Sequence, residues 1–374
     1  MILPTALYKN LLRPLLFKAD PESVHDLAMA TAGRVSNSPW LCSRLRSLFS
    51  FDHASLAVQA AGINFAHPIG LAAGWDKNGR GIPLWEAIGF GHVEIGSISA
   101  DFSAGNPKPR LFRVPQDRAI VVNYGLPNDG AERVAHRLEN VRSRLKTPLG
   151  INIVNTNRGP AACAESDEQI VADFVQAINR LEPQATYLVL NLSCPNTGEG
   201  RAFVSDPNRV RKLMRAVAAL HLVKPLFLKV APFSDPATLD SFIDAVHDYD
   251  FVRGFSINLP SGKPACMTAP RQLLNKMPGA VSGWPSEAAA NHGISEIYRR
   301  IDPRRHIIIA SGGVFTAADA WRKIQLGATL VQCLTAVVYE GPAVIGTICE
   351  GLAAIAREEG LKRIQDGVGT AKRE

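Results

Sequence analysis

The chain lacks the sequence patterns of several large protein classes. No hydrophobic run is long enough to cross a bilayer, and the start, Met1-Ile2-Leu3-Pro4, has neither the basic stretch nor the cleavage site of a secretory signal. The six cysteines contain no Cys-x-x-Cys pair, which leaves zinc, iron–sulfur and thioredoxin-like sites unsupported. We therefore expect no bound metal, and scattered thiols that stay reduced in the cytoplasm.

Two further absences concern nucleotides and nucleic acids. No Gly-x-Gly-x-x-Gly follows a predicted strand, so the usual dinucleotide-binding fingerprint is missing. The formal net charge is +7, yet no basic run with interleaved aromatic residues occurs, which predicts no nucleic-acid partner. Such a diffuse positive charge suits an anionic substrate, a phosphate-bearing cofactor or an acidic membrane surface.

What the chain does contain is a repeated alternation of short apolar runs and amphipathic stretches. Its 374 residues, 46% of them hydrophobic, suffice for one large domain with a small appendage, or for two domains. The amphipathic stretches include 167–181, 207–220, 236–249 and 316–326. The predicted strands are 68–75, 92–99, 148–154, 187–194, 225–232, 252–259, 306–313 and 330–337. Eight such repeats predict an α/β fold, a (β/α)8 TIM barrel, with an open doubly wound sheet as the alternative.

The most informative segment is 190–197, where a buried strand ends in polar side chains. Asn191, Ser193, Cys194 and Asn196 crowd around Pro195, which stops the strand. Polar side chains at the carboxyl end of a barrel strand are typical of a ligand site, although a local Asx or Ser/Thr turn would also use them. The pattern recurs at the ends of other strands, in Lys77, Ser97, Asn152, Lys229, Asn258 and Thr335.

Two of these features carry their own physical argument. Lys229 lies within the apolar run Leu226-Phe227-Leu228-Lys229-Val230, and a buried ammonium needs an anionic or acceptor partner. Ser311-Gly312-Gly313 follows the seventh predicted strand, where glycines let backbone N–H groups approach a phosphate and the next helix adds its positive end. Either could be structural alone, as an ion pair or a turn. Together at one barrel face they favour a binding site.

These residues resemble the class 2, quinone-dependent and membrane-associated dihydroorotate dehydrogenase family over nearly the whole chain. The matching blocks are Leu16–Phe17–Lys18–Ala19–Asp20–Pro21–Glu22–Ser23–Val24–His25, and the segments 68–77, 94–97, 105–113, 150–153, 191–197, 282–283, 311–313 and 327–332.

The resemblance implies an FMN enzyme that oxidises dihydroorotate to orotate in pyrimidine biosynthesis. A base removes a proton beside a carbonyl while a hydride leaves the neighbouring carbon for the flavin. Cys194 takes the position of the base. The implied substrate contacts are Lys77, Asn191, Asn196 and Asn258. The implied FMN contacts are Ala73, Gly74, Lys77, Ser97, Asn152, Asn191, Lys229, Gly283, Gly312, Gly313 and Thr335.

Several positions depart from the family pattern. Cysteine at 194 resembles the soluble class 1 enzymes, since class 2 members have serine there. Apolar residues replace the family's polar or aromatic substrate contacts at Val122, Leu126, Pro127 and Leu259, and Leu334 replaces a tyrosine. An alternative function is therefore the same flavin chemistry on another cyclic amide, lactam or acyl compound. A non-catalytic flavin-binding barrel is a third hypothesis, disfavoured by the thiol at the base position.

Residues 1–50 form a separate segment ahead of the barrel domain, 51–374. Leu7, Leu11, Leu12, Leu15 and Leu16 make an apolar helix face interrupted by basic residues, and Asp20-Pro21 begins a second helix to about residue 33. The pattern alone favours a helical hairpin packed on the barrel. The resemblance implies instead a membrane-surface segment through which quinone reaches the flavin past His25 and Arg110. It places the protein peripherally on the cytoplasmic side of the inner membrane, with a soluble cytoplasmic protein as the alternative.

Overall fold

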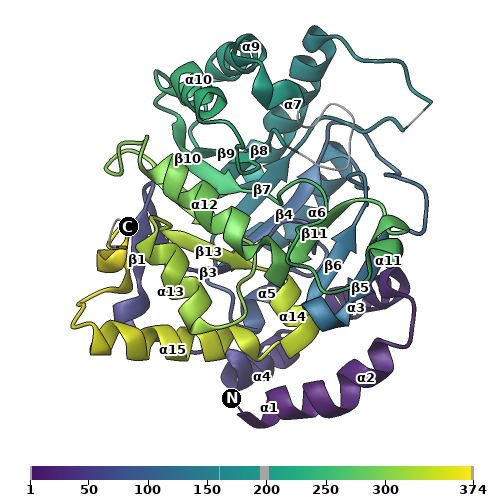
Figure 1. Cartoon of the computed structure of the whole chain (residues 1–374), viewed down its shortest axis with the longest axis vertical. Coiled ribbons are helices and arrows are strands. Elements are labelled where there is room, and N and C mark those ends of the chain that lie inside the picture. Colours follow the sequence, from purple (N-terminus) through teal and green to yellow (C-terminus); the bar gives the residue numbers. More distant parts are fainter. Residues whose placement is uncertain (1, 160, 194–201, 372–374) are drawn as a thin grey trace.

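Eight parallel strands close into a barrel at the centre of the molecule (Figure 1). The computed structural model describes residues 2–159, 161–193 and 202–371. Around the barrel the strands follow the order β10-β12-β13-β3-β4-β7-β8-β9. Their bounds are β3 (Ile69–Leu71), β4 (His92–Ile98), β7 (Leu149–Ile153), β8 (Tyr187–Asn191), β9 (Leu226–Val230), β10 (Val252–Ile257), β12 (Ile307–Ala310) and β13 (Leu330–Cys333).

Each of the eight predicted strands is present, which confirms the TIM barrel. The strands are buried on both faces because helices cover the outside and side chains fill the inside. The parallel register sets polar residues from different strands side by side, as where Asn191 of β8 pairs with Lys229 of β9. Most observed strands end before their predicted limits, because the polar residues at their carboxyl ends leave the ladder and form the loops of the barrel mouth.

A layer of helices surrounds the barrel. Ser166 and Gln169 form a capping box at the start of α7 (Asp167–Leu181), and Thr316 and Asp319 form one at α13 (Ala317–Gln325), so both helices lie within predicted amphipathic stretches or start next to them. The remaining outer helices are α5 (Ile82–Ala87), α6 (Ala131–Arg142), α9 (Pro207–Ala218), α10 (Pro236–Val246), α12 (Glu287–Tyr298) and α15 (Val344–Glu358), with short α8 (Ala202–Ser205), α11 (Arg271–Asn275) and α14 (Thr335–Glu340).

Two small antiparallel sheets were not predicted. One is the hairpin of β1 (Val58–Ala60) and β2 (Ile63–Phe65). The other joins β5 (Leu111–Val114), β6 (Ala119–Val122) and β11 (Ala280–Gly283). Its strands have only four residues each, and β11 comes from a loop far along the chain from β5 and β6. The alternation of strands and helices therefore gave no signal for it.

The N-terminal helices pack against the barrel. They are α1 (Ile2–Leu7), the π-helical turn η1 (Tyr8–Leu12), α2 (Arg13–Leu16), α3 (Pro21–Ser36) and α4 (Pro39–Phe49). Ala32 of α3 and Phe49 at the end of α4 belong to the same buried core as the barrel strands. Among the described helices, none combines the length and the apolar character that a membrane crossing requires.

Candidate active site at the mouth of the barrel

A cavity of about 390 Å³ opens at the carboxyl ends of the barrel strands. It extends from β6 and the strand ends to the N-terminal helices. Of the residues implied as cofactor or substrate contacts, Asn152 does not line it, whereas the following described ones do: Ala73, Gly74, Lys77, Ser97, Asn191, Lys229, Asn258, Gly283, Gly312, Gly313 and Thr335. Residues from eight loops or strands thus meet in one place.

Hydrogen bonds join polar side chains at the strand ends into one network along this cavity. Ser97 Oγ donates to Asn152 Oδ1 at 2.5 Å and accepts from Asn191 Nδ2 at 3.1 Å. Asn258 Nδ2 donates in turn to Asn191 Oδ1 at 3.2 Å. This hydrogen-bond network therefore joins strands β4, β7 and β8 to the end of β10. Side chains held in this way keep fixed orientations, so their remaining donors and acceptors face a ligand without prior rearrangement.

Glu94 on β4 anchors this network, and the sequence analysis missed it. Its carboxylate accepts from Asn152 Nδ2 and from Gln332 Nε2, each at 2.8 Å. Lys229 Nζ lies 3.5 Å from the same carboxylate. Glu94 is fully buried, so it is the anionic partner that a buried Lys229 required. A charged residue inside the apolar run 92–99 was the available signal.

Glycines shape the opposite side of the cavity. Gly312 and Gly313 have φ angles of +90° and +71°, and a Cβ on Gly313 would lie 2.4 Å from Glu287 Cβ. Gly283 has φ +98°, and a Cβ there would meet the Arg118 carbonyl oxygen at 2.3 Å. At Gly283 and Gly313 side chains are thus excluded both by conformation and by space, and at Gly312 they are disfavoured by conformation, which leaves backbone groups open to the cavity. Thr335 begins α14 beside them, with its hydroxyl 3.1 Å from Ser282 Oγ.

Lys77 lies in the loop after β3, which Asp76 holds in shape. The Asp76 carboxylate accepts from the backbone N–H groups of Arg80 and Gly81 at 2.9 and 2.8 Å. Lys77 Nζ stands 3.9 Å from the centre of the Tyr124 ring. Burial, and then the positive charge of Arg110, lowers the pKa of Lys77 to about 8. Its ammonium is therefore a cation that can bind an anionic ligand near neutral pH.

The four apolar replacements in the substrate region all line the cavity. Val122 ends β6, and Leu126 and Pro127 follow in the next loop, with Leu126 held at φ +64°. Leu259 comes directly after Asn258. These four residues give the cavity an apolar wall, and polar side chains such as Lys77, Asn191 and Asn258 line other parts of it.

Helix α3 closes the cavity on the side of the N-terminal segment. His25 lines it together with Val24 and Ala28. The His25 Nε2 atom lies 2.9 Å from the Trp75 carbonyl oxygen, and burial followed by the charge of Lys77 lowers the pKa of His25 to about 3. The imidazole is therefore neutral at neutral pH.

Arg110, the other residue implied in quinone access, does not line this cavity. It lies behind the Tyr124 ring, 5.3 Å from its centre, and donates to Glu22 Oε1 at 2.9 and 3.1 Å. Arg110 thus ties β5 to α3. Cys194 and Asn196, the implied base and a substrate contact, fall outside the described residues. The groups of His, Cys, Asp and Glu within the described part of the chain include no cluster suited to a metal ion.

The fold and the cavity together define a TIM barrel with a glycine-rich turn and a cluster of polar side chains at the barrel mouth, which is where enzymes of this fold bind their ligands. The model of the dihydroorotate dehydrogenase family matches residues 55–356, and the chain belongs to that family. Membership implies a flavin cofactor and oxidoreductase chemistry on a CH–CH bond.

Similar proteins agree with this assignment. Proteins named dihydroorotate dehydrogenase (quinone) from Mycobacterium sp. (strain KMS) and Myxococcus xanthus are each 36% identical to the chain, covering 97% of it and 98% of their own lengths. A crystal structure of DHODH from Eimeria tenella in complex with ferulenol superimposes with a TM-score of 0.84 at 28% identity, covering 100% of this chain and 99% of that one. These similarities confirm the predicted class 2 relationship and do not favour the alternative of a different substrate.

Proposed function

We propose that this protein oxidises dihydroorotate to orotate with bound FMN and passes the electrons to a quinone. The observation that carries the proposal is that one cavity is lined by all the residue groups that the reaction needs. They are the glycine cradle (Gly283, Gly312 and Gly313), Lys229, the carboxamides of Asn191 and Asn258, Lys77, and helix α3. Such a cavity can hold a flavin, with a small substrate on one side of the flavin and an apolar oxidant on the other side.

The residues present suit FMN. The turn at Gly312 and Gly313 offers backbone N–H groups where a Cβ would clash, which suits the phosphate. Asn191 supplies a carboxamide, and Lys229 supplies a cation close to Glu94, for the polar edge of the isoalloxazine ring, while Asn152 holds Ser97 in place from outside the cavity. When bound, FMN supplies hydride acceptance from carbon and electron transfer to a second acceptor.

The chain's own residues bind and orient the substrate. Lys77 attracts the substrate carboxylate, and the amides of Asn191 and Asn258 hold the ring by hydrogen bonds. Cys194 is the proposed base, and Asn196 a further contact. An ordinary thiol has a pKa near 8.5, so a small fraction of it is thiolate near neutral pH and can accept a proton. A serine hydroxyl is a far weaker acid and stays protonated there. The apolar wall at Val122, Leu126, Pro127 and Leu259 excludes water from the reacting carbon.

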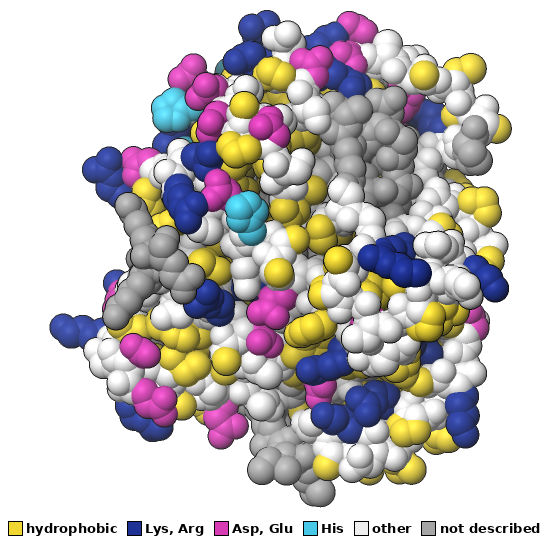
Figure 2. Space-filling model, in the orientation of Figure 1, with side chains coloured by type: hydrophobic (Ala, Val, Ile, Leu, Met, Phe, Trp, Pro, Cys, Tyr) yellow, Lys and Arg dark blue, Asp and Glu magenta, His cyan; other side chains and the backbone are white. Residues whose placement is uncertain are grey.

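The N-terminal segment, residues 1–50, is proposed to lie on the cytoplasmic face of the inner membrane as a peripheral attachment. One side of it docks on the barrel, where Tyr8 Oη donates to the Val338 carbonyl at 2.7 Å and Arg13 Nη1 to that of Tyr339 at 2.9 Å. Leu7, Leu11, Leu12 and Leu15 point to the outside and remain exposed. Figure 2 shows hydrophobic side chains beside lysine and arginine along the lower part of the molecule, where α1 and α2 lie. An apolar face flanked by basic residues is typical of an interfacial helix.

Anaerobic flavin bleaching tests the proposed reaction. Purified protein reconstituted with FMN is mixed with dihydroorotate, dihydrouracil and simple lactams, and the flavin absorbance is followed by stopped flow. We expect dihydroorotate to reduce the flavin fastest and a quinone to restore it. Cys194→Ala should slow the reduction by about 10²–10⁴-fold, the usual contribution of a general base. Reduction by a lactam but not by dihydroorotate would support the alternative substrate, and failure to bind FMN would contradict the proposal.

A further inference from the structure

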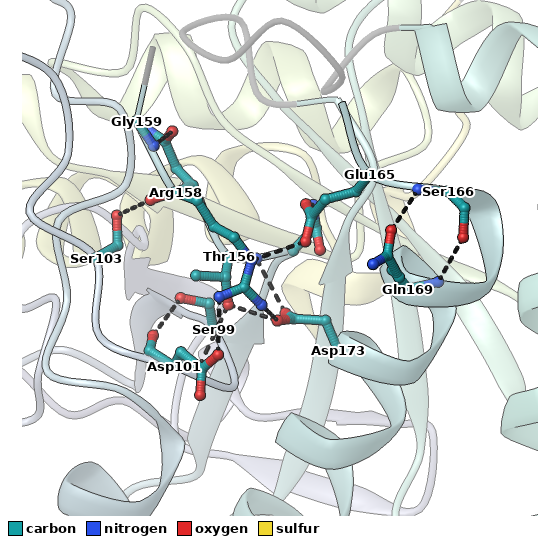
Figure 3. A network of polar contacts seen from close by, with 12 residues as sticks. Ser99, Asp101, Ser103, Thr156, Arg158, Gly159, Glu165, Ser166, Gln169 and Asp173 are labelled. Atoms are coloured by element: carbon teal, nitrogen blue, oxygen red, sulfur yellow. Dashed lines mark hydrogen bonds and ion pairs between the residues drawn. The ribbon is translucent and has the colours of Figure 1, made fainter. Parts of the chain in front are cut away.

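Arg158 lies at the centre of a polar network just beyond the end of β7 (Figure 3). Its guanidinium contacts three carboxylates that come from different parts of the chain. Nε donates to Glu165 Oε1 at 2.9 Å, Nη1 donates to Asp101 Oδ2 at 3.0 Å, and Nη2 lies 3.5 Å from Asp173 Oδ1. Without this cation, the three negative charges would share one region and repel one another.

The same carboxylates hold the loop that follows β7. The Thr156 N–H donates to Asp173 Oδ2 at 3.0 Å, and the Thr156 hydroxyl donates to Asp173 Oδ1 at 2.6 Å. Asn155 Nδ2 donates to Glu165 Oε2 at 2.8 Å. Asp173 is buried on α7, so its position is set by the packing of that helix. Arg158 therefore stabilises both the acidic groups and the loop 154–159 that they hold.

Asn157 connects the loop after β7 to the loop after β6 by hydrogen bonds. Its Nδ2 donates to the Gly125 carbonyl at 2.7 Å, while its own carbonyl accepts from Ser103 Oγ at 2.8 Å. Asn128 Nδ2 donates to the Leu126 carbonyl at 3.0 Å from the other side. The backbone at 125–126 is thus held at two successive carbonyl groups.

The residues on either side of Gly125 reach the ligand cavity. Tyr124 places its ring against the Lys77 ammonium, and Leu126 and Pro127 form part of the apolar wall. A shift of the Gly125 backbone would move the Tyr124 ring, and with it the cation expected to bind the substrate. The glycine cradle (Gly283, Gly312 and Gly313) lies on or after β11 and β12, and none of the hydrogen bonds that hold the 124–127 loop involves these glycines.

We propose that Arg158 is a positioning residue for substrate binding, which acts through Asn157 on the 124–127 loop and on the Tyr124–Lys77 pair. Its role in turnover rests on the proposed oxidation of dihydroorotate, whereas its effect on the loop does not. The substrate side of the site thus depends on an ion cluster that touches neither substrate nor flavin.

Arg158→Met and Arg158→Lys, compared with wild type, test the proposal. Arg180→Met is the matched control: Arg180 lies on the same helix as Asp173 but pairs with Glu132 at the surface, with both side chains more than 60% exposed. We expect Arg158→Met to raise KM for dihydroorotate about tenfold, with kcat within about threefold and FMN affinity unchanged. Lysine should restore part of the loss, because a single ammonium cannot reach three carboxylates as the planar guanidinium does.

Hydrogen–deuterium exchange separates this inference from the proposed function. In Arg158→Met, and in Asn157→Ala where the ion cluster stays intact, amides in 122–128 should exchange faster, while those of the distant α13 should not. If dihydroorotate fails to reduce wild-type protein, the proposed function is wrong, and the exchange data still report on the loop. Unchanged exchange and KM in both variants would overturn the inference. An equal loss of FMN binding and kcat would also overturn it, since it would show a general structural role.

Discussion

Among single residues, the two lysines of the cavity, Lys229 and Lys77, differ in the partner that each ammonium group has. Lys229 is neutralised within the protein by Glu94, which lies in the middle of β4 and also orients Asn152 and Gln332. Lys77 has no carboxylate at that range in the described ion pairs, and it faces an aromatic ring instead. A cation without a close protein counter-ion is the one that an anionic substrate can neutralise, so Lys77 is expected to dominate the dependence of binding on pH.

We expect kcat/KM for dihydroorotate to fall as the pH rises above about 8. The pKa of Lys77 is lowered to about 8, so the side chain is charged below that pH and loses its charge above it, while the substrate carboxylate stays ionised. The profile of kcat/KM reports groups in the free enzyme and is therefore the quantity to measure. Lys77→Met should lower kcat/KM at pH 7 by roughly 10- to 100-fold, the value of one charged hydrogen bond, and should remove the decline. A decline that persists unchanged in this variant would assign it to another group.

At the scale of elements, α3 serves both the core and the cavity. One side of it contributes Ala32 to the core, and another presents Val24, His25 and Ala28 to the cavity. The helix can do this because Asp20 caps its start, accepting from the Ser23 N–H at 2.8 Å, and because Arg110 binds Glu22 in its first turn. The proposed path of the quinone thus follows a helix that is fixed at its beginning.

Ala28→Phe should narrow the proposed path of the quinone along α3 without touching the proposed substrate contacts. Because the added ring would occupy the α3 side of the cavity, we expect reoxidation of the reduced flavin by a quinone to slow at least tenfold. Reduction by dihydroorotate should stay within about twofold of wild type. Double-mixing stopped flow measures the two half-reactions separately. Equal slowing of both would mean that the helix has moved as a whole, and no effect on either would place the quinone elsewhere.

The helices before α3 should govern attachment to membranes. Leu11 and Leu15 are 55% and 59% exposed, and burying their side chains in a lipid interface would be favourable. We expect Leu11→Glu/Leu15→Glu to reduce co-sedimentation with vesicles containing anionic lipid several-fold, while flavin reduction is retained. Val223→Glu, at a side chain 82% exposed between α9 and β9, is the control and should bind vesicles as wild type does. Equal binding by all three proteins would contradict the role of the N-terminal face.

At the scale of the whole molecule, buried neutral histidines link the fold to pH. Burial lowers the pKa of His67 to about 4 and that of His92 to about 3. The unfolded chain takes up these protons below about pH 6.5, whereas the folded protein takes them up only near pH 3–4. Stability from these groups is therefore complete above about pH 6.5 and is lost as the pH falls.

His92→Phe should make the protein less sensitive to acid. The His92 ring packs edge-on against Phe65 at 5.6 Å, and neither ring nitrogen has a hydrogen-bond partner among the described residues, so phenylalanine keeps the packing. Urea unfolding at pH 7.5 and pH 5 would give the free energy of unfolding of each protein. We expect the variant to lose less stability than wild type over that interval. An equal or greater loss would show that His92 does not contribute to acid sensitivity.

Much of the architecture could be predicted from local sequence patterns. The eight strands, the amphipathic helices at 167–181 and 316–326, and the polar residues at strand ends follow from short-range periodicity and side-chain chemistry. A closed parallel barrel brings the carboxyl ends of all its strands to one face, so residues such as Ser97, Asn191 and Asn258 could be assigned to one site before any contact was known. Their roles in binding FMN and substrate stay predictions.

The partners of these residues were decided only by the tertiary structure. Glu94 beside Lys229, β11 beside β6, and Asn157 on the Gly125 carbonyl each join segments that are distant in the chain. Hydrophobic periodicity reports which face of an element is buried, but it carries no information about which distant side chain will meet it there. Arg110 illustrates the difference: the family resemblance implies a role at the quinone path, which stays a prediction, whereas its contact with Glu22 follows from the packing of the elements. Such pairings depend on the relative placement of whole elements, because charge and hydrogen bonding act over a few ångströms that only the folded chain defines.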